Sequence, residues 1–107
     1  MTVETNNEKY CELALQGLYS VDDPEIGLNI VDLGLVYQIE FLETEKKLNL
    51  IMTLTSQFCP MGESIVSNVT ESLQNSFKDW KVEVNLTYEP AWDSSKISPE
   101  GQEFLGY

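Results

Sequence analysis

Residues 50–61 read Leu50-Ile51-Met52-Thr53-Leu54-Thr55-Ser56-Gln57-Phe58-Cys59-Pro60-Met61, an apolar run followed by a cysteine and a proline. The run repeats with a period of two, because Leu50, Met52 and Leu54 share one face, and this period predicts a β-strand. Proline is favoured at the first position of a helix, where the N–H that it lacks would have no partner. We therefore expect a strand that ends near Thr55 and a helix that begins at Pro60.

Cys59 falls at or near the N-cap of this predicted helix. Free N–H groups and the positive end of the helix dipole favour a thiolate there, and lower the usual thiol pKa of about 8.5 by one or more units. The chain has no histidine, so few other side chains offer a reactive or metal-binding group. Cys59 is the candidate for that role; the alternative is an ordinary residue at a helix start.

Composition narrows the class of protein. A chain of 107 residues with 42% hydrophobic residues predicts one folded domain over residues 1–107. Its apolar runs are too short to span a membrane, and the polar residues 1–7 do not resemble a secretory signal, so we expect a cytoplasmic protein. The net charge of −12 disfavours nucleic acid and anionic membranes as partners, and favours a basic protein.

The residue types limit the chemistry further. Without histidine, Ser-His and Cys-His catalysis are excluded, so a thiol enzyme is disfavoured. The two cysteines, Cys11 and Cys59, are too few for a four-cysteine zinc site or for complete ligation of an iron–sulfur cluster by one chain. A metal or cluster would need ligands shared with a second copy, a partner protein or small thiols. Cys11 lies beside an apolar helical stripe and is predicted to pack as a small hydrophobe at the core edge.

The hydrophobic pattern predicts an α/β (α+β) fold with the order α-β-β-α-β. The expected elements are a helix at about 6–18, a hairpin of strands 35–42 and 48–55, a helix at 60–77, a strand at 80–88 and a short helical tail. They would form a small mixed three-stranded sheet with helices on one face and a right-handed crossover. Because the two parallel strands end at the same edge, Trp92 is expected near Cys59.

A helix cap and the inward-facing positions of these elements are also predicted. Thr5-Asn6-Asn7-Glu8 has the form of a capping box at the start of the first helix. The inward positions are expected to be Tyr10, Leu13, Ala14, Gly17 and Leu18 in the first helix, Tyr37, Ile39 and Phe41 in the first strand, and Val82, Val84, Leu86 and Tyr88 in the last.

Four blocks of sequence, in order, resemble the metal–sulfur cluster assembly family that includes SufT-like and PaaD-like proteins and the eukaryotic cytosolic iron–sulfur targeting component. They are residues 21–25 (VDDPE), 29–37 (NIVDLGLVY), 52–55 with Cys59-Pro60, and 90–92 (PAW) followed by 97–101 (ISPEG) and 105–106. The resemblance implies the same α/β fold and a non-enzymatic role in assembling iron–sulfur clusters or inserting them into client proteins. PaaD-like members carry a further cysteine-rich segment, and no cysteine follows Cys59 here, which argues against that subgroup and its ring-oxygenase maturation system.

The resemblance also implies a site. The family's cysteine maps onto Cys59, its acidic loop onto Asp23 and Glu25, and its polar strand end onto Thr55 and Ser56.

In this hypothesis the Cys59 thiolate is a transient ligand for iron or a cluster, and a homodimer would present two of them. Asp23 or Glu25 completes the ligation or holds the surroundings, and Thr55 and Ser56 donate hydrogen bonds to sulfur. Trp92 covers the site or docks a partner.

The expected partners are iron–sulfur assembly or carrier proteins and apo client proteins. Three alternatives stay open: an adaptor that bridges these partners without metal, turn and capping roles for Thr55 and Ser56, and a core-plug role for Trp92.

Overall fold

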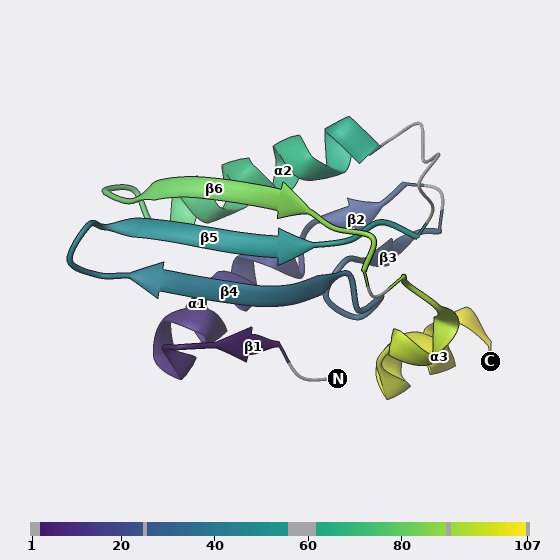
Figure 1. Cartoon of the computed structure of the whole chain (residues 1–107). Coiled ribbons are helices and arrows are strands. Elements are labelled where there is room, and N and C mark those ends of the chain that lie inside the picture. The colour runs from purple at the N-terminus through teal and green to yellow at the C-terminus, as the bar shows by residue number, and fades with distance from the viewer. Residues whose placement is uncertain (1–2, 25, 56–61, 90, 107) are drawn as a thin grey trace.

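The computed structural model describes residues 3–24, 26–55, 62–89 and 91–106 (Figure 1). One mixed sheet has the strand order β1-β4-β5-β6, and a second, two-stranded sheet pairs β2 with β3. The strands are β1 (Glu4–Thr5), β2 (Asp22–Asp23), β3 (Leu28–Asn29), β4 (Val36–Leu42), β5 (Lys47–Met52) and β6 (Lys81–Leu86). The helices are α1 (Glu8–Leu18), α2 (Gly62–Ser76), the 3-10 turn η1 (Ser94–Lys96) and α3 (Pro99–Leu105).

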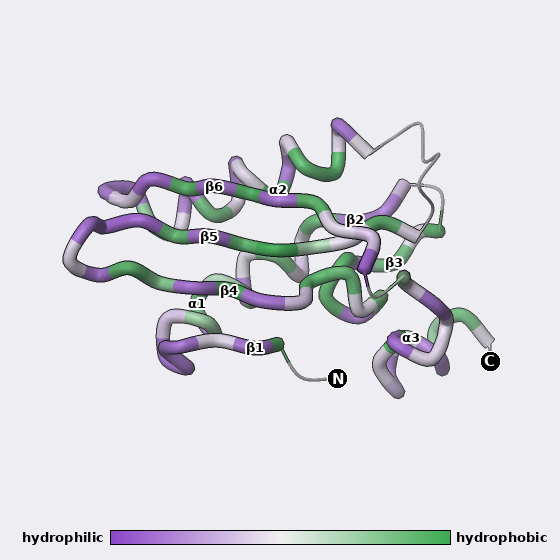
Figure 2. The backbone as a smooth tube through the Cα atoms, in the orientation of Figure 1, coloured by the Kyte–Doolittle hydropathy of each residue, from purple (hydrophilic) through white to green (hydrophobic). Residues whose placement is uncertain are grey.

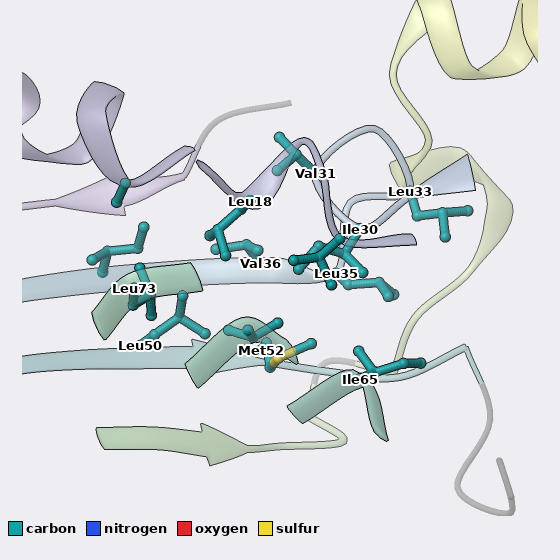
Figure 3. Close-up of a cluster of buried hydrophobic side chains, with 14 of the residues drawn as sticks. Leu18, Ile30, Val31, Leu33, Leu35, Val36, Leu50, Met52, Ile65 and Leu73 are labelled. Carbon is teal, nitrogen blue, oxygen red and sulfur yellow. The ribbon is translucent and has the colours of Figure 1, made fainter. Parts of the chain in front are cut away.

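The predicted α/β architecture is confirmed. β4 and β5 form the antiparallel hairpin. α2 connects β5 to β6, and these two strands pair in parallel, while α3 is the helical tail. Figure 1 shows α1 and α2 on the same face of the sheet. Between the sheet and these helices lies one apolar cluster, in which Leu50 and Met52 of β5 lie with Ile65 and Leu73 of α2 (Figure 3). The predicted start of α2 at Pro60 lies outside the described residues.

The predicted three-stranded sheet is wrong in one respect, because the main sheet has a fourth strand, β1, at its edge. β1 adds in parallel to β4, with Glu4 opposite Gln38 and Thr5 opposite Ile39. The next residue extends the pairing with its side chain, because the Asn6 amide donates to the carbonyl of Phe41 at 2.8 Å and accepts from its N–H at 2.9 Å. A strand of two residues carries no periodicity, so the hydrophobic pattern gives no signal for it.

The predicted capping box is also wrong. Thr5 belongs to β1, and α1 begins one residue after its N-cap Asn7, whose side-chain oxygen accepts from the N–H of Tyr10 at 3.1 Å. The inward stripe is shifted accordingly, since Cys11 is buried among the core residues and Leu13 is 45% exposed. The core-edge packing predicted for Cys11 is therefore confirmed.

Two strand predictions change for geometric reasons. The register of β4 against β5 shifts between Val36 and Gln38, which leaves Tyr37 as a bulge residue, half-buried, while Val36 takes the core position. β6 lies at the edge of the sheet, so Leu86 is 42% exposed although it is on the helix side of the strand. A bulge changes which face a residue points to, and periodicity alone cannot locate one.

Candidate functional site

The predicted site belongs to the end of the sheet where β5 and β6 terminate. Figure 1 shows the β2–β3 sheet at this same end of the molecule. Thr55, half-buried, and Gly62, buried, are the described residues on either side of residues 56–61. Cys59, Ser56 and Glu25 lie outside the described residues, so their predicted roles stay predictions. The common edge predicted for the ends of the two parallel strands is confirmed by their pairing.

Gly62 fixes how closely α2 approaches the end of the β5 segment. A Cβ at this position would lie 2.8 Å from the Cδ1 atom of Leu54, closer than such contacts allow. The first described turn of the helix is therefore packed tightly on the residue before Thr55. The two described flanks of residues 56–61 therefore lie close together.

Of the two predicted acidic residues, Asp23 is the one that the structure describes, and it is 0% exposed. Its backbone carbonyl accepts from the N–H groups of Ile26 and Gly27, at 3.2 and 2.8 Å, and these bonds close the turn between β2 and β3. Burying a carboxyl group costs free energy that surface positions do not incur. Such a group, at the end of a two-residue strand and next to a turn, is a candidate for a functional role. The sequence identified the residue but not its burial.

Trp92 is anchored to the body of the protein. Its indole N–H donates to the carbonyl of Leu33 at 2.6 Å, and the half-buried ring packs against the core cluster. These contacts support the core-plug reading of Trp92, in which the ring fixes the chain that follows β6. A further role in covering Cys59 or docking a partner stays a prediction.

Asp32 joins the loop before β4 to the tail, a role that the sequence reasoning missed. Its carboxylate accepts from Asn29 Nδ2 at 2.7 Å and from the Ser98 hydroxyl at 2.8 Å, and its carbonyl accepts from the Ser98 N–H at 2.7 Å. Ser98 is the N-cap of α3, which packs on Leu28 through Gly101. Residues 29–37 and 97–101, two of the segments that resemble the family, are thus joined by these hydrogen bonds. A serine before a proline was the available signal for this cap.

A second polar cluster surrounds Tyr37, because the bulge turns this side chain away from the core. Lys96 Nζ lies 5.5 Å from the centre of its ring. Burial raises the pKa of the Tyr37 hydroxyl, a hydrogen bond with Thr53 opposes that rise, and the charge of Asp93 adds to it. Thr53 itself is 0% exposed. The cluster links β4 and β5 to the segment that follows Trp92.

The described residues contain no group of three or more His, Cys, Asp or Glu side chains placed to hold a metal ion. Cys11 is a free thiol, but it is 5% exposed and packed in the core. Burial, the largest effect, raises the pKa of this thiol, and the nearby Glu12 and Glu8 raise it further against a hydrogen bond with Thr5. A buried, protonated thiol is a poor metal ligand.

Among the residues that the structure describes, no helix is both long enough and apolar enough to cross a membrane.

The arrangement of these elements is that of a known class of protein. Residues 14–86 match the model of the iron–sulfur cluster assembly protein family, and the chain belongs to this family.

Among its relatives is the Fe-S protein maturation auxiliary factor SufT of Staphylococcus aureus, which is 38% identical over 80% of this chain and 97% of its own. The auxiliary factor YitW of Bacillus subtilis is 35% identical over 89% of this chain and 92% of its own. A solved domain of unknown function from Bacillus anthracis superimposes with a TM-score of 0.86 at 35% identity, over 92% of this chain and 93% of that one.

Proposed function

We propose that this protein is a non-enzymatic accessory factor that assembles iron–sulfur clusters or transfers them to client proteins in the cytoplasm, with Cys59 as a transient ligand of iron or of a cluster. Membership of the iron–sulfur cluster assembly family is the observation that carries the proposal. The relatives named as Fe-S protein maturation auxiliary factors support the same role. The core position of Cys11 supports the choice of Cys59, because the chain has two cysteines and one of them is enclosed.

The chemistry of a single thiolate suits transfer better than storage. Thiolates are the usual ligands of iron–sulfur clusters, and one per chain gives weak, exchangeable binding. The remaining ligands would come from a second copy, a carrier protein or a client. In this proposal Asp23 or Glu25 supplies oxygen ligation or holds the loop, Thr55 and Ser56 donate hydrogen bonds to the sulfur, and Trp92 shields the site.

The test is anaerobic loading with iron and sulfide, followed by absorbance and native mass measurement. We expect a cluster absorbance band in the wild-type protein that is lost in Cys59→Ser. The matched control is Cys11→Ala, which removes the enclosed thiol and should retain the band. Loss of the band in Cys11→Ala, with its fold intact by circular dichroism, would contradict the assignment of Cys59 as the ligand.

A second candidate function is an adaptor that bridges a carrier and a client without holding metal. The excess of 18 acidic over 6 basic residues favours it, because such a surface suits contacts with basic proteins. Activity of a client enzyme matured in the presence of Cys59→Ser separates the two roles. Full maturation by this variant supports the adaptor, and loss of maturation supports ligation by Cys59.

A further inference from the structure

β6 is an edge strand of the four-stranded sheet. Among the described residues this strand has a hydrogen-bonded neighbour on one side only, β5. Lys81 N–H donates to the Lys46 carbonyl and Thr87 N–H to the Met52 carbonyl, each at 2.8 Å. Since a parallel ladder uses every second residue of a strand, the backbone groups of Val82, Val84 and Leu86 point to the outer side.

The two halves of this edge differ in charge. The first half carries Lys81 and Glu83, and charged side chains on an edge strand discourage pairing with another chain. From Val84 to Leu86 there is no charged residue, and Leu86 is 42% exposed. The second half of β6 therefore lacks the charged side chains that discourage another strand from pairing with the first half.

Two hollows flank this unprotected half. The helix-side hollow, about 710 Å³, lies between β6 and α2 and is lined by Leu54, Val66, Leu86 and Tyr88 among others. The open-face hollow, about 630 Å³, lies on the other face of the sheet and is lined by Ile51, Asn85, Leu86 and Thr87 among others. An added strand points successive side chains to opposite faces, so its residues would enter the two hollows in turn.

The rims of the hollows are mainly acidic. Glu63 and Glu71 line the helix-side hollow, and Glu89 lines the open-face hollow next to β6. The open-face hollow is also lined by Glu4, on β1 at the opposite edge of the sheet, and by Lys96, the one basic residue in the described lining. Lys96 is already placed over the ring of Tyr37. An occupant with lysine or arginine beside its apolar residues complements this charge.

A second copy of this chain is a poorer occupant. A second copy would bring the same acidic residues, Glu63, Glu71 and Glu89, toward those of the first, and like charges repel. The net charge of −12 on each copy adds to the repulsion.

We propose that the edge of β6 at Val84–Leu86 binds an extended segment of a partner protein in which apolar residues alternate with lysine or arginine. The segment adds as a strand, and its alternate side chains enter the two hollows. This proposal rests on the proposed function for its meaning, since the segment would belong to a carrier or a client protein. It does not depend on metal binding by Cys59.

The probe is a dye-labelled, seven-residue capped peptide that alternates valine or leucine with lysine or arginine. A second peptide of the same composition, with its basic residues in one block, controls for charge alone. We expect the alternating peptide to bind, measured by fluorescence anisotropy, and to slow hydrogen exchange at the amides of Val84 and Leu86. Equal affinity of the two peptides, or no binding of the alternating one, overturns the proposal.

Variants locate the binding surface. Leu86→Lys should weaken binding about tenfold or more, through lost apolar contact and added repulsion. Leu13→Lys is the matched control, because Leu13 is 45% exposed on α1, and should leave the affinity unchanged. Val84→Pro removes an outward N–H without removing a bond to β5, and should abolish binding. Unchanged affinity in folded Leu86→Lys, or a doubled mass of the protein without peptide, overturns the proposal.

The same titration with Cys59→Ser separates this inference from the proposed function. Peptide binding that persists in this variant, together with lost cluster loading, supports both proposals. Peptide binding that disappears in Cys59→Ser overturns an edge site that is independent of the thiol. Cluster loading without peptide binding in the wild-type protein overturns the edge site alone.

Discussion

The thiol of Cys11 shows how one buried residue bears on function. It is packed among the core residues, and its pKa is raised chiefly by burial. Protonation and enclosure both suppress reaction, because the thiolate is the nucleophile and the metal ligand. The chain's other cysteine, Cys59, is thereby the proposed ligand, and the difference between the two thiols can be measured directly.

We predict that one thiol per native chain reacts quickly with a disulfide reagent at pH 8, and that two react in denaturant. The reason is that Cys11 stays protonated and enclosed until the core opens. Thiol release is followed by absorbance, with Cys59→Ser and Cys11→Ala in parallel. The fast phase should disappear in Cys59→Ser and stay in Cys11→Ala. Two fast thiols in the native wild-type protein would show that Cys11 is accessible.

At the scale of elements, the packed hairpin and crossover could be predicted because their hydrophobic repeats are long. β1 and the bulge at Tyr37 could not, since a two-residue strand and a one-residue register shift leave no repeat. The site follows the same division. The acidic loop was recognised through the resemblance, but the burial of Asp23 depends on the packing of the β2–β3 sheet. The joint between Asp32 and Ser98 spans 66 residues of sequence, which local patterns do not reach.

Two glycines with the same backbone conformation test the contact between the loop before β4 and the tail. Gly27 and Gly34 have φ angles of +81° and +78°, so alanine at either position is strained by about 1–2 kcal/mol. A Cβ at Gly34 would overlap the carbonyl oxygen of Lys96, whereas one at Gly27 meets no atom of the described residues within 4 Å. We predict that Gly34→Ala destabilises the protein by about 1–3 kcal/mol more than Gly27→Ala, measured by urea unfolding. Equal losses of unfolding free energy in the two variants would show that the segment around Lys96 moves away from the alanine Cβ without a measurable free-energy cost.

At the scale of the whole molecule, an aromatic cluster and the described residues of the proposed site, Asp23 and Thr55, lie at opposite ends of the sheet (Figure 1). An aromatic cluster of Tyr10, Phe41, Phe77 and Trp80, with ring centres 5.5 to 6.0 Å apart, joins α1, β4 and the end of α2 near the β4–β5 turn. Figure 2 shows the backbone at this turn as hydrophilic and the carboxyl-terminal part of β5 as hydrophobic. The carboxyl-terminal part of β5 is thus apolar on the side of the proposed site, and the aromatic cluster stabilises the fold at the other end.

The excess of acidic side chains affects the stability of the whole molecule. The chain has 18 acidic and 6 basic residues, and within the described part the structure has one ion pair, Lys47–Glu83 at 3.2 Å. A net charge of this size destabilises the compact state by self-repulsion. Salt shortens the range of that repulsion from about 30 Å at 0.01 M to about 10 Å at 0.1 M. Salt should therefore stabilise this protein, the opposite of its effect on a fold held by surface ion pairs.

We predict that Tm rises between 0.01 and 0.3 M sodium chloride, by about 4–8 °C for each 1 kcal/mol of repulsion that is screened. Calorimetry at constant pH measures the change. In the double variant Glu12→Lys/Glu103→Lys, two substitutions of +2 each reduce the net charge from −12 to −8, and the rise should be smaller. Both positions are exposed, so the variant alters charge with little loss of packing. A Tm that is unchanged or falls with salt would show that self-repulsion does not limit the stability of the fold.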